Sequence, residues 1–199
     1  MKKKLIFATG NEKKMEEIRA ILSDATLEIV SMKEVGIDIE VVEDGETFMD
    51  NAIIKATAIA KAVKDLSITA IVLADDSGLE IDYLNKEPGV YSARYEGVDT
   101  PYTVKNKILL ERLSKVEKAK RTARFVCAIA AVRSDGEIIT AQDTIEGYIS
   151  LEPAGEHGFG YDPIFYVPEH HCTSAQLPPD IKNKLSHRGK ALRAMKDKL

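Results

Sequence analysis

Apolar and polar positions follow two different periods along the first half of the chain. Short apolar runs over residues 4–8 and 68–74 predict buried strands. Over residues 11–24 and 45–66, apolar residues recur every three to four positions, which predicts two helices with one apolar face each. Asn11 is suited to cap the first of these helices. Strands therefore alternate with helices in this half.

The second half contains longer strands and a broken helical tail. Residues 124–149 read as two strands around a turn at 134–136, where Ser-Asp-Gly stands. The tail over 180–199 reads as helical with an interruption at Ser186. We also expect the run over 68–74 to form a hairpin with residues 78–82. Together the pattern predicts an α/β fold with a mixed sheet, not a purely parallel one.

Length and composition narrow the class. A chain of 199 residues suits a single domain, 1–199, with a substantial core. A net charge of −4 argues against a broad nucleic-acid surface but leaves room for an anionic small molecule. No apolar run is long enough to cross a bilayer, and we expect a cytoplasmic protein. Cys127 lies in an apolar run, and neither it nor Cys172 has the neighbours of a zinc site or redox pair.

The stretch TGNEKK, residues 9–14, stands between the first strand and the first helix. A helix N-terminus offers unpaired N–H groups to an anion, and Lys14 lies within reach of a phosphate there. The pattern is neither a Walker A loop nor a dinucleotide fingerprint. On this stretch alone, a capped turn with solvated lysines is the better interpretation.

Three acids form the second candidate: Glu43, Asp75 and Asp76. Mg²⁺ takes carboxylate and phosphate oxygens, often with only one or two carboxylates from the protein. Because side chains alternate along a strand, Asp75 and Asp76 should point in opposite directions. A polar strand end with a surface acid is an equally good interpretation at this point.

Two further motifs contain polar groups beside aromatic or basic residues. GFGYDPIF, beginning at Gly158, would fix an aromatic wall suited to stacking on a base, although a rigid loop covering the core explains it better when taken alone. In the tail, Ser186, His187 and Arg188 follow Lys182 by about one helical turn. No nucleophile elbow accompanies Ser186, so a serine-hydrolase interpretation is disfavoured.

In this order, TGNEKK, ADDSGLEID…PGVYSARY, GFGYDPIF and SHR resemble the motifs of the inosine triphosphate pyrophosphatase family, the non-canonical purine NTP pyrophosphatases. The resemblance covers residues 5 to 193. It implies a two-lobed α/β fold with an elongated mixed sheet flanked by helices, a substrate cleft between the lobes, and a homodimer. The implied reaction hydrolyses ITP, dITP or XTP to the monophosphate and pyrophosphate with Mg²⁺.

The resemblance also implies roles for individual residues. Asp76 would be the catalytic proton acceptor with Asp75 beside it, and Glu43 and Asp76 would bind the metal. The triphosphate would be bound by Thr9, Gly10, Asn11, Glu12, Lys13 and Lys14, with help from Lys55. The nucleoside would be surrounded by Ser77, Phe159, Gly160, Tyr161, Asp162, Lys182, His187 and Arg188.

Two questions stay open at the level of sequence. A donor such as Arg188 suits the oxygen at the purine 6-position and would leave adenine unsatisfied, but the element that rejects the 2-amino group of guanine is not identified. His170, His171, Cys172, Ser174 and Gln176 depart from the pattern of similar proteins. We interpret the histidines and Cys172 as loop residues, because no partner ligand stands at metal spacing. A nucleotide sensor without turnover and a less selective NTPase are the competing functions.

Overall fold

The computed structural model describes residues 2–199, which divide into two compact units. Unit 1 holds the described residues up to Asp76 together with Cys127–Asp143 and Arg188–Leu199, and unit 2 holds Ser77–Val126 and Thr144–His187. Three long strands contribute residues to both units. Each unit is described separately below.

The strands form a single sheet in the order β2-β1-β3-β4-β5-β6-β7. Their bounds are β1 Lys3–Phe7, β2 Leu27–Ser31, β3 Ile71–Ile81, β4 Thr122–Val132, β5 Ile138–Ile149, β6 Phe165–Val167 and β7 Cys172–Thr173. β1 runs parallel to both β2 and β3, whereas β6 is antiparallel to β5 and β7. The predicted mixed sheet is therefore confirmed.

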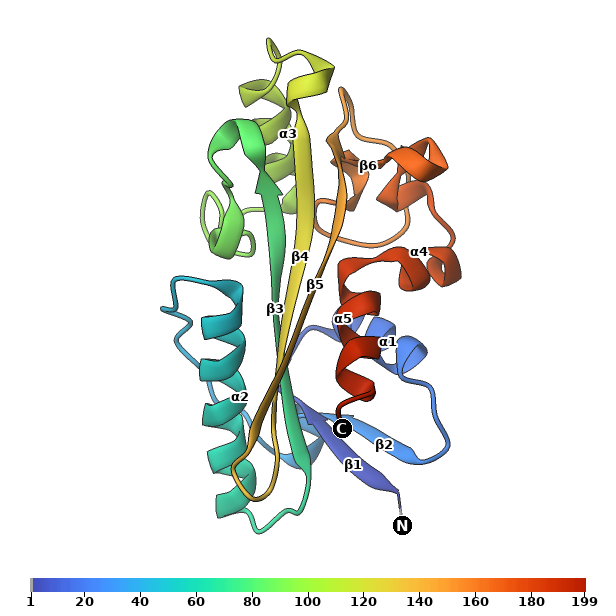
Figure 1. The fold of residues 1–199 in the computed structure, drawn as a ribbon. Helices are drawn as coiled ribbons and strands as arrows, with labels where there is room; N and C mark the ends of the chain where they lie inside the picture. The colour runs from blue at the N-terminus through green and yellow to red at the C-terminus, as the bar shows by residue number, and fades with distance from the viewer. Residues whose placement is uncertain (1) are drawn as a thin grey trace. The chain divides into compact units, whose positions relative to one another are not determined.

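In unit 1, helices cover both faces of the sheet (Figure 1). α2, Phe48–Asp65, lies on one face, and α1, Glu12–Ile21, lies on the other with α5, His187–Lys196. Asn11 caps α1 as predicted, and Thr47 begins α2 through a capping box. These caps fix where both helices start.

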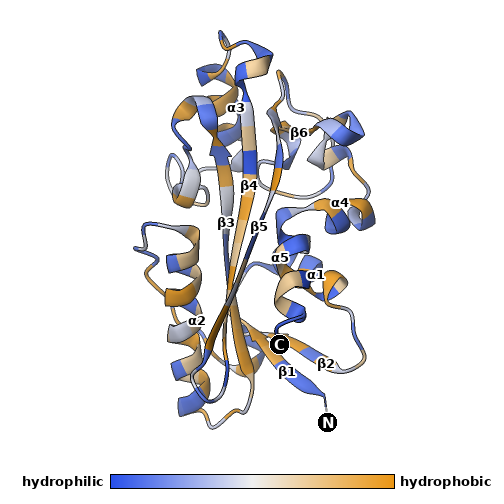
Figure 2. Ribbon diagram, viewed as in Figure 1, coloured by the Kyte–Doolittle hydropathy of each residue, from blue (hydrophilic) through white to orange (hydrophobic). Residues whose placement is uncertain are grey.

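The core of unit 1 explains why the strands are so apolar. β4 is orange along most of its length in Figure 2, while α2 mixes blue and orange. Leu5, Phe7 and Leu73 pack with Ile18 of α1 and Leu192 of α5, and all five side chains are at most 1% exposed. A strand covered on both faces needs apolar residues at successive positions, which is the pattern that the sequence shows.

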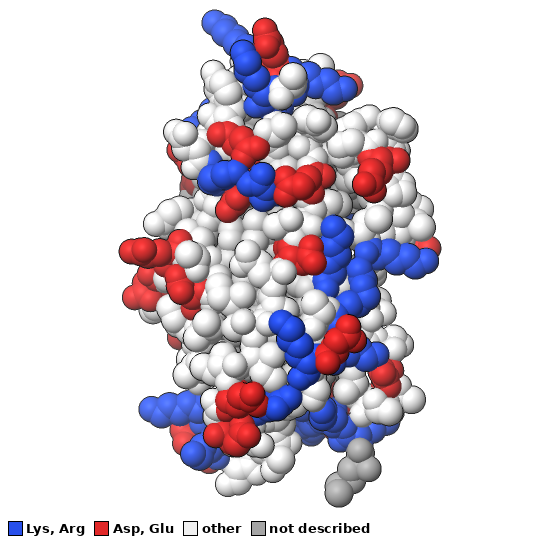
Figure 3. Space-filling view, viewed as in Figure 1, with Lys and Arg blue, Asp and Glu red and all other residues white. Residues whose placement is uncertain are grey.

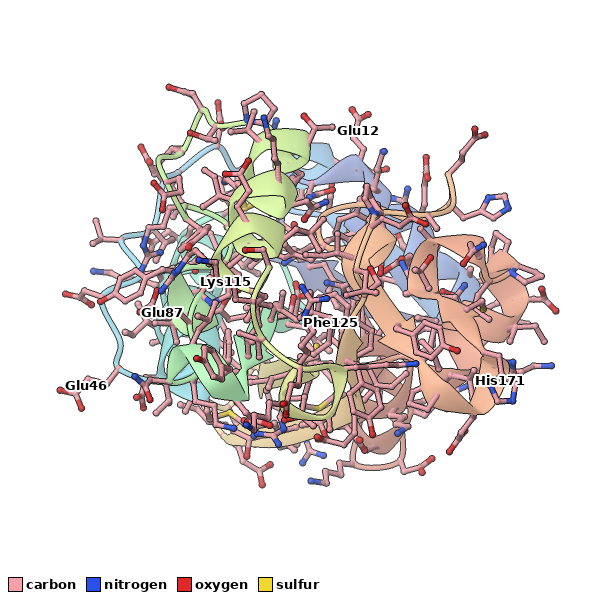
Figure 4. The ribbon with its side chains drawn as sticks, turned by 90° about the horizontal axis from the view of Figure 1, so that it is seen from above. Glu12, Glu46, Glu87, Lys115, Phe125 and His171 are labelled. Carbon is pink, nitrogen blue, oxygen red and sulfur yellow. The ribbon has the colours of Figure 1, made fainter. Side chains whose placement is uncertain are left out.

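Unit 2 contains α3, Tyr102–Arg112, and α4, Pro179–Leu185. Its core includes Leu79, Leu109 and Phe125, with the rings of Phe125 and Phe165 only 4.4 Å apart. Phe125 lies among the other side chains in the view from above (Figure 4). Phe165 and Val167 of the short β6 pack into this core, as do Tyr161 and Ile164 of the irregular segment before it.

One local prediction is wrong and two are confirmed. Residues 68–74 and 78–82 do not form a hairpin, because β3 continues unbroken through Ser77 and Gly78. The Ser-Gly pair suggested a turn, but the aspartates before it have partners on opposite sides of the extended chain. The turn at 134–136 is confirmed, and so is the break at Ser186, whose extended backbone separates α4 from α5.

Crossing a bilayer requires a helix that is both long and apolar, and this can be judged for every helix within residues 2–199. None of them meets both requirements.

Candidate active site

One group of predicted site residues lies in unit 1, where β1 ends and β3 continues. Phe7, the last residue of β1, pairs with Leu73, and the Ala8 N–H donates to the Leu73 carbonyl over 2.7 Å. Asp75 and Asp76 therefore extend beyond the end of β1, beside the loop that follows it. Because β2 and β3 flank β1, the connections diverge at this edge, and open α/β sheets bind ligands at such points.

α1 begins just after the carboxyl end of β1, and the free N–H groups of its first turn face that end of the strand. Asn11 Oδ1 accepts the Lys14 N–H over 3.2 Å, and Thr9 Oγ1 accepts the Asn11 N–H over 3.2 Å. The Lys14 ammonium lies 3.1 Å from Asp75 Oδ2. A helix start and a lysine together favour an anion. The other residues predicted for this loop are exposed: Gly10, Glu12 and Lys13.

Asp75 is the centre of a buried group of charges. It is 2% exposed and accepts from Arg188 at 3.3 and 3.4 Å, while Arg188 also bonds Glu17 over 2.5 Å. Burial alone would raise the pKa of Asp75, but the nearby cations, chiefly Lys14 and Arg188, outweigh burial and hold its pKa far below the usual range. Arg188 thus has two carboxylate partners in unit 1, and its contact with the nucleoside stays a prediction.

Asp76 points to the opposite face of β3, toward α2, as the alternation of side chains predicts. Asn51 Nδ2 donates to Asp76 Oδ2 over 3.0 Å, and Lys55 pairs with Glu43 over 2.8 Å. Burial raises the pKa of Asp76, the charge of Glu43 adds to this rise, and the bond from Asn51 opposes it. For Lys55, burial disfavours the charged form, but carboxylates, chiefly Asp75 and Glu43, outweigh it and raise the pKa.

These donors fit a hard divalent cation. Among residues 2–199, no cluster of three or more His, Cys, Asp or Glu side chains could hold a metal ion by itself. Mg²⁺ commonly takes one or two carboxylates and completes its shell with phosphate oxygens and water, which matches Glu43 and Asp76. Acidic side chains also gather around the loop before α2 in Figure 3, where Asp44 and Glu46 are exposed. A cation would offset the repulsion between this loop and a polyphosphate.

A separate group of predicted site residues lies in unit 2, in a loop organised by Asp162. This carboxylate is 4% exposed and accepts three bonds of 2.8 Å, from Lys182 Nζ, Ser174 Oγ and the Phe159 backbone N–H. The Lys182 ammonium also lies 5.2 Å from the centre of the half-buried Phe159 ring. Gly158 has φ +76°, and a Cβ there would collide with Asp162, so only glycine fits. The arrangement holds one aromatic ring in a fixed place.

Other predicted nucleoside residues have structural contacts in unit 2. Tyr161 is 3% exposed, and its hydroxyl donates to the Ser92 carbonyl over 2.7 Å. The His187 ring stacks on Phe125 at 4.8 Å. Two more predicted residues have less buried positions: Gly160, whose carbonyl accepts from Asn106 over 3.1 Å, and Ser77, which lies half-buried in β3 directly after Asp76.

The segment over residues 170–176 has a clear local structure. His171 is exposed at the edge of unit 2, where Figure 4 shows it pointing outward, and it adopts φ +51°. Ser174 bonds Asp162, and the Gln176 side chain closes a capping box with Thr173. Ser174 therefore supports the loop around Asp162, whereas Gln176 fixes the turn that begins at Thr173.

Three residues that touch the candidate site were missed by sequence reasoning: Asn51, Glu17 and Ser174. Asn51 lies inside a helix expected only to pack, and its partner Asp76 is 25 residues away. Glu17 lies one helical turn after Lys13, yet its partner Arg188 is 171 residues away. The only sequence signal for such residues was a polar side chain at a helix position that should face the core, as at Asn51.

These features define an α/β protein with a helix start suited to an anion beside two adjacent carboxylates. The model of the Ham1 family matches residues 5–198, and the chain belongs to this family. It is 48% identical to a dITP/XTP pyrophosphatase of Clostridium perfringens, over 99% of this chain and 97% of that protein. It is 46% identical to a dITP/XTP pyrophosphatase of Bacillus subtilis, over 97% of this chain and 95% of that protein.

Solved structures agree with this assignment. The Staphylococcus aureus Ham1 protein superposes with a TM-score of 0.85 at 39% identity, covering 98% of this chain and 97% of that one. A Ham1 protein from Coxiella burnetii gives a TM-score of 0.85 at 40% identity, with the same coverage of both chains.

Proposed function

We propose that this protein hydrolyses non-canonical purine nucleoside triphosphates, namely ITP, dITP and XTP, to the monophosphate and pyrophosphate. The observation that carries the proposal is the place where β1 ends, which brings the start of α1 and Lys14 against Asp75, the residue before Asp76. The relatives named dITP/XTP pyrophosphatase support it over nearly the full chain. Removal of such nucleotides from the pool would be the physiological role.

The residues of unit 1 would divide the work on the phosphates. The α1 N-terminus and Lys14 bind and orient the triphosphate. Asp76 accepts the proton of the attacking water, and Asp75 keeps the Lys14 ammonium in place. Mg²⁺, held by Glu43 and Asp76, would neutralise charge on the phosphates when bound. Phosphoryl chemistry depends mainly on positioning and electrostatics, which these groups supply.

Residues of unit 2 would bind the nucleoside. The Phe159 ring is held by the Asp162 and Lys182 contacts and offers a stacking surface. Hydrogen-bond donors of the protein that face the purine 6-position would pair with the oxygen that hypoxanthine and xanthine carry there. Adenine carries an amine at that position, and this amine would face another donor and remain unpaired. We further propose a cytoplasmic homodimer, as the family resemblance implies.

A product assay tests the proposal directly. The protein is incubated with ITP, XTP, ATP and GTP in the presence of Mg²⁺, and phosphorus NMR identifies the products. We expect pyrophosphate and the monophosphate from ITP and XTP, with much slower turnover of ATP and GTP. Orthophosphate without pyrophosphate would reject the cleavage position. Equal turnover of ATP and ITP would favour the less selective NTPase, and tight ITP binding without turnover would favour the sensor.

A further inference from the structure

Asn51 connects two segments of unit 1 through both ends of its side-chain amide. It lies in the first turns of α2 and is 0% exposed. Its Oδ1 accepts the Gly45 N–H over 2.8 Å, and its Nδ2 donates to Asp76 Oδ2 over 3.0 Å. These partners fix the orientation of the amide, because a carboxylate requires the NH₂ group and an N–H requires the oxygen.

The loop that Asn51 contacts carries Glu43. A Cβ on Gly45 would lie 2.6 Å from the Asp50 Cβ and 2.8 Å from Asn51 Oδ1, so the backbone approaches the helix as closely as glycine alone permits. The Thr47–Asp50 capping box fixes the next turn of the chain. The loop is therefore attached to α2 immediately after Glu43, and Asn51 is the residue that also contacts Asp76.

We infer that Asn51 is a positioning residue that sets the spacing between the Glu43 and Asp76 carboxylates and thereby the affinity for a divalent cation. This inference rests on the proposed function, in which these two carboxylates bind Mg²⁺. Outer partners that orient metal-binding carboxylates typically change metal affinity 10–100-fold when they are removed. Asn51 acts through Asp76 and the loop and touches no reacting atom.

The test measures Mn²⁺ binding to the full-length protein without nucleotide, using the electron paramagnetic resonance signal of free Mn²⁺. For Asn51→Leu, which keeps the branching of the side chain but removes both hydrogen bonds, we expect roughly 10–100-fold weaker binding. The matched control is Asn106→Leu in unit 2, which removes another buried asparagine, bonded to Gly160, and should leave Mn²⁺ binding unchanged. Wild-type affinity in Asn51→Leu would overturn the inference.

If Asn51→Leu does not fold, which the loss of a cooperative unfolding transition would show, a second variant still tests the inference. Gly45→Ala leaves Asn51 and Asp76 in place but forces the loop away from α2, so it should weaken Mn²⁺ binding in the same direction. Unchanged binding in Gly45→Ala would then reject the inference, as would the absence of Mn²⁺ binding by the wild type. Failure of the proposed function appears separately, as wild-type protein that releases no pyrophosphate from ITP.

Discussion

Asp75 in unit 1 and Asp162 in unit 2 are both buried carboxylates that bond a lysine, but their surroundings differ. The Asp75 carboxylate forms ion pairs with Lys14 and Arg188, and it lies one residue before a second carboxylate, Asp76. The Asp162 carboxylate accepts hydrogen bonds from the Lys182 ammonium and from two neutral donors, the Ser174 hydroxyl and a backbone N–H. The first arrangement concentrates charge, whereas the second fixes the shape of a loop.

This difference predicts which step each unit affects. Charges in unit 1 would act where charge develops on the phosphates, so changes there should lower turnover. The loop in unit 2 would position an aromatic ring beside the base, so changes there should raise KM and alter base discrimination.

Replacement of the proposed base should have the largest effect. Asp76→Asn keeps the size of the side chain but cannot accept a proton, so we expect kcat to fall roughly 10²–10⁴-fold. Single-turnover measurements with ITP would report the loss, and ITP binding should largely remain. Asp65→Asn, at the exposed end of α2, is the matched control and should turn over normally. Near-normal turnover by Asp76→Asn would contradict the assignment of the base.

The sequence predicted features whose causes are local. Asn11 caps α1, and the Ser-Asp-Gly turn joins β4 to β5, because each depends on residues within a few positions. The hairpin expected around Ser77 was wrong for the opposite reason. Partners distant in sequence, such as Lys14 and Asn51, keep β3 extended there, and tertiary contacts override the local preference for a turn.

The candidate site was predicted to a similar extent. Family motifs supplied Lys14, Asp75 and Asp76, and the structure brings Lys14 and Asp75 together. The motifs did not indicate that Asn51 would contact Asp76 or that Ser174 would bond Asp162, because neither contact follows from the spacing of residues in a motif. Such contacts depend on how elements pack, which periodicity alone does not specify.

The two buried carboxylates should differ in their effect on stability. Asp75→Asn leaves Lys14 and Arg188 without a charged partner at that position, and we expect a loss of about 3–5 kcal/mol in the free energy of unfolding. Asp162→Asn removes the charged partner of only one cation, Lys182, so the free energy of unfolding should fall by less. Urea denaturation of both variants would measure the difference. An equal or larger loss for Asp162→Asn would contradict the contrast between the two units.

A lysine in unit 2 tests whether the loop acts mainly on substrate binding. Lys182→Met keeps the apolar stem but removes the bond to Asp162, so the Phe159 ring should be held less firmly. A hydrogen bond to a charged group contributes about 1.5–3 kcal/mol, so KM for ITP should rise roughly tenfold or more while kcat changes less. Steady-state kinetics with ITP and ATP would show the KM change and a narrower gap between the two bases.

Lys184→Met, on the same short helix, is the control for that experiment. It removes one positive charge while Lys182 keeps its bond to Asp162, so it should leave the ratio of ITP to ATP turnover as in the wild type. A fall in kcat for Lys182→Met at unchanged KM would instead place Lys182 with the groups that act on the phosphates, and the division between the units would then be wrong.

Tyr161 offers the smallest and most selective test, because family resemblance places it beside the nucleoside while the structure places it in the core of unit 2. Tyr161→Phe removes only the hydroxyl that donates to the Ser92 carbonyl, and it should lower the free energy of unfolding by about 1 kcal/mol. Because the ring itself is retained, the edge-to-face contact with Tyr102 at 5.2 Å should persist, and Phe159 should keep its position. Thermal unfolding and KM for ITP, measured on the same preparation, separate the two roles: a stability loss at constant KM supports the structural role, whereas a raised KM at constant stability would show that the hydroxyl contacts the substrate.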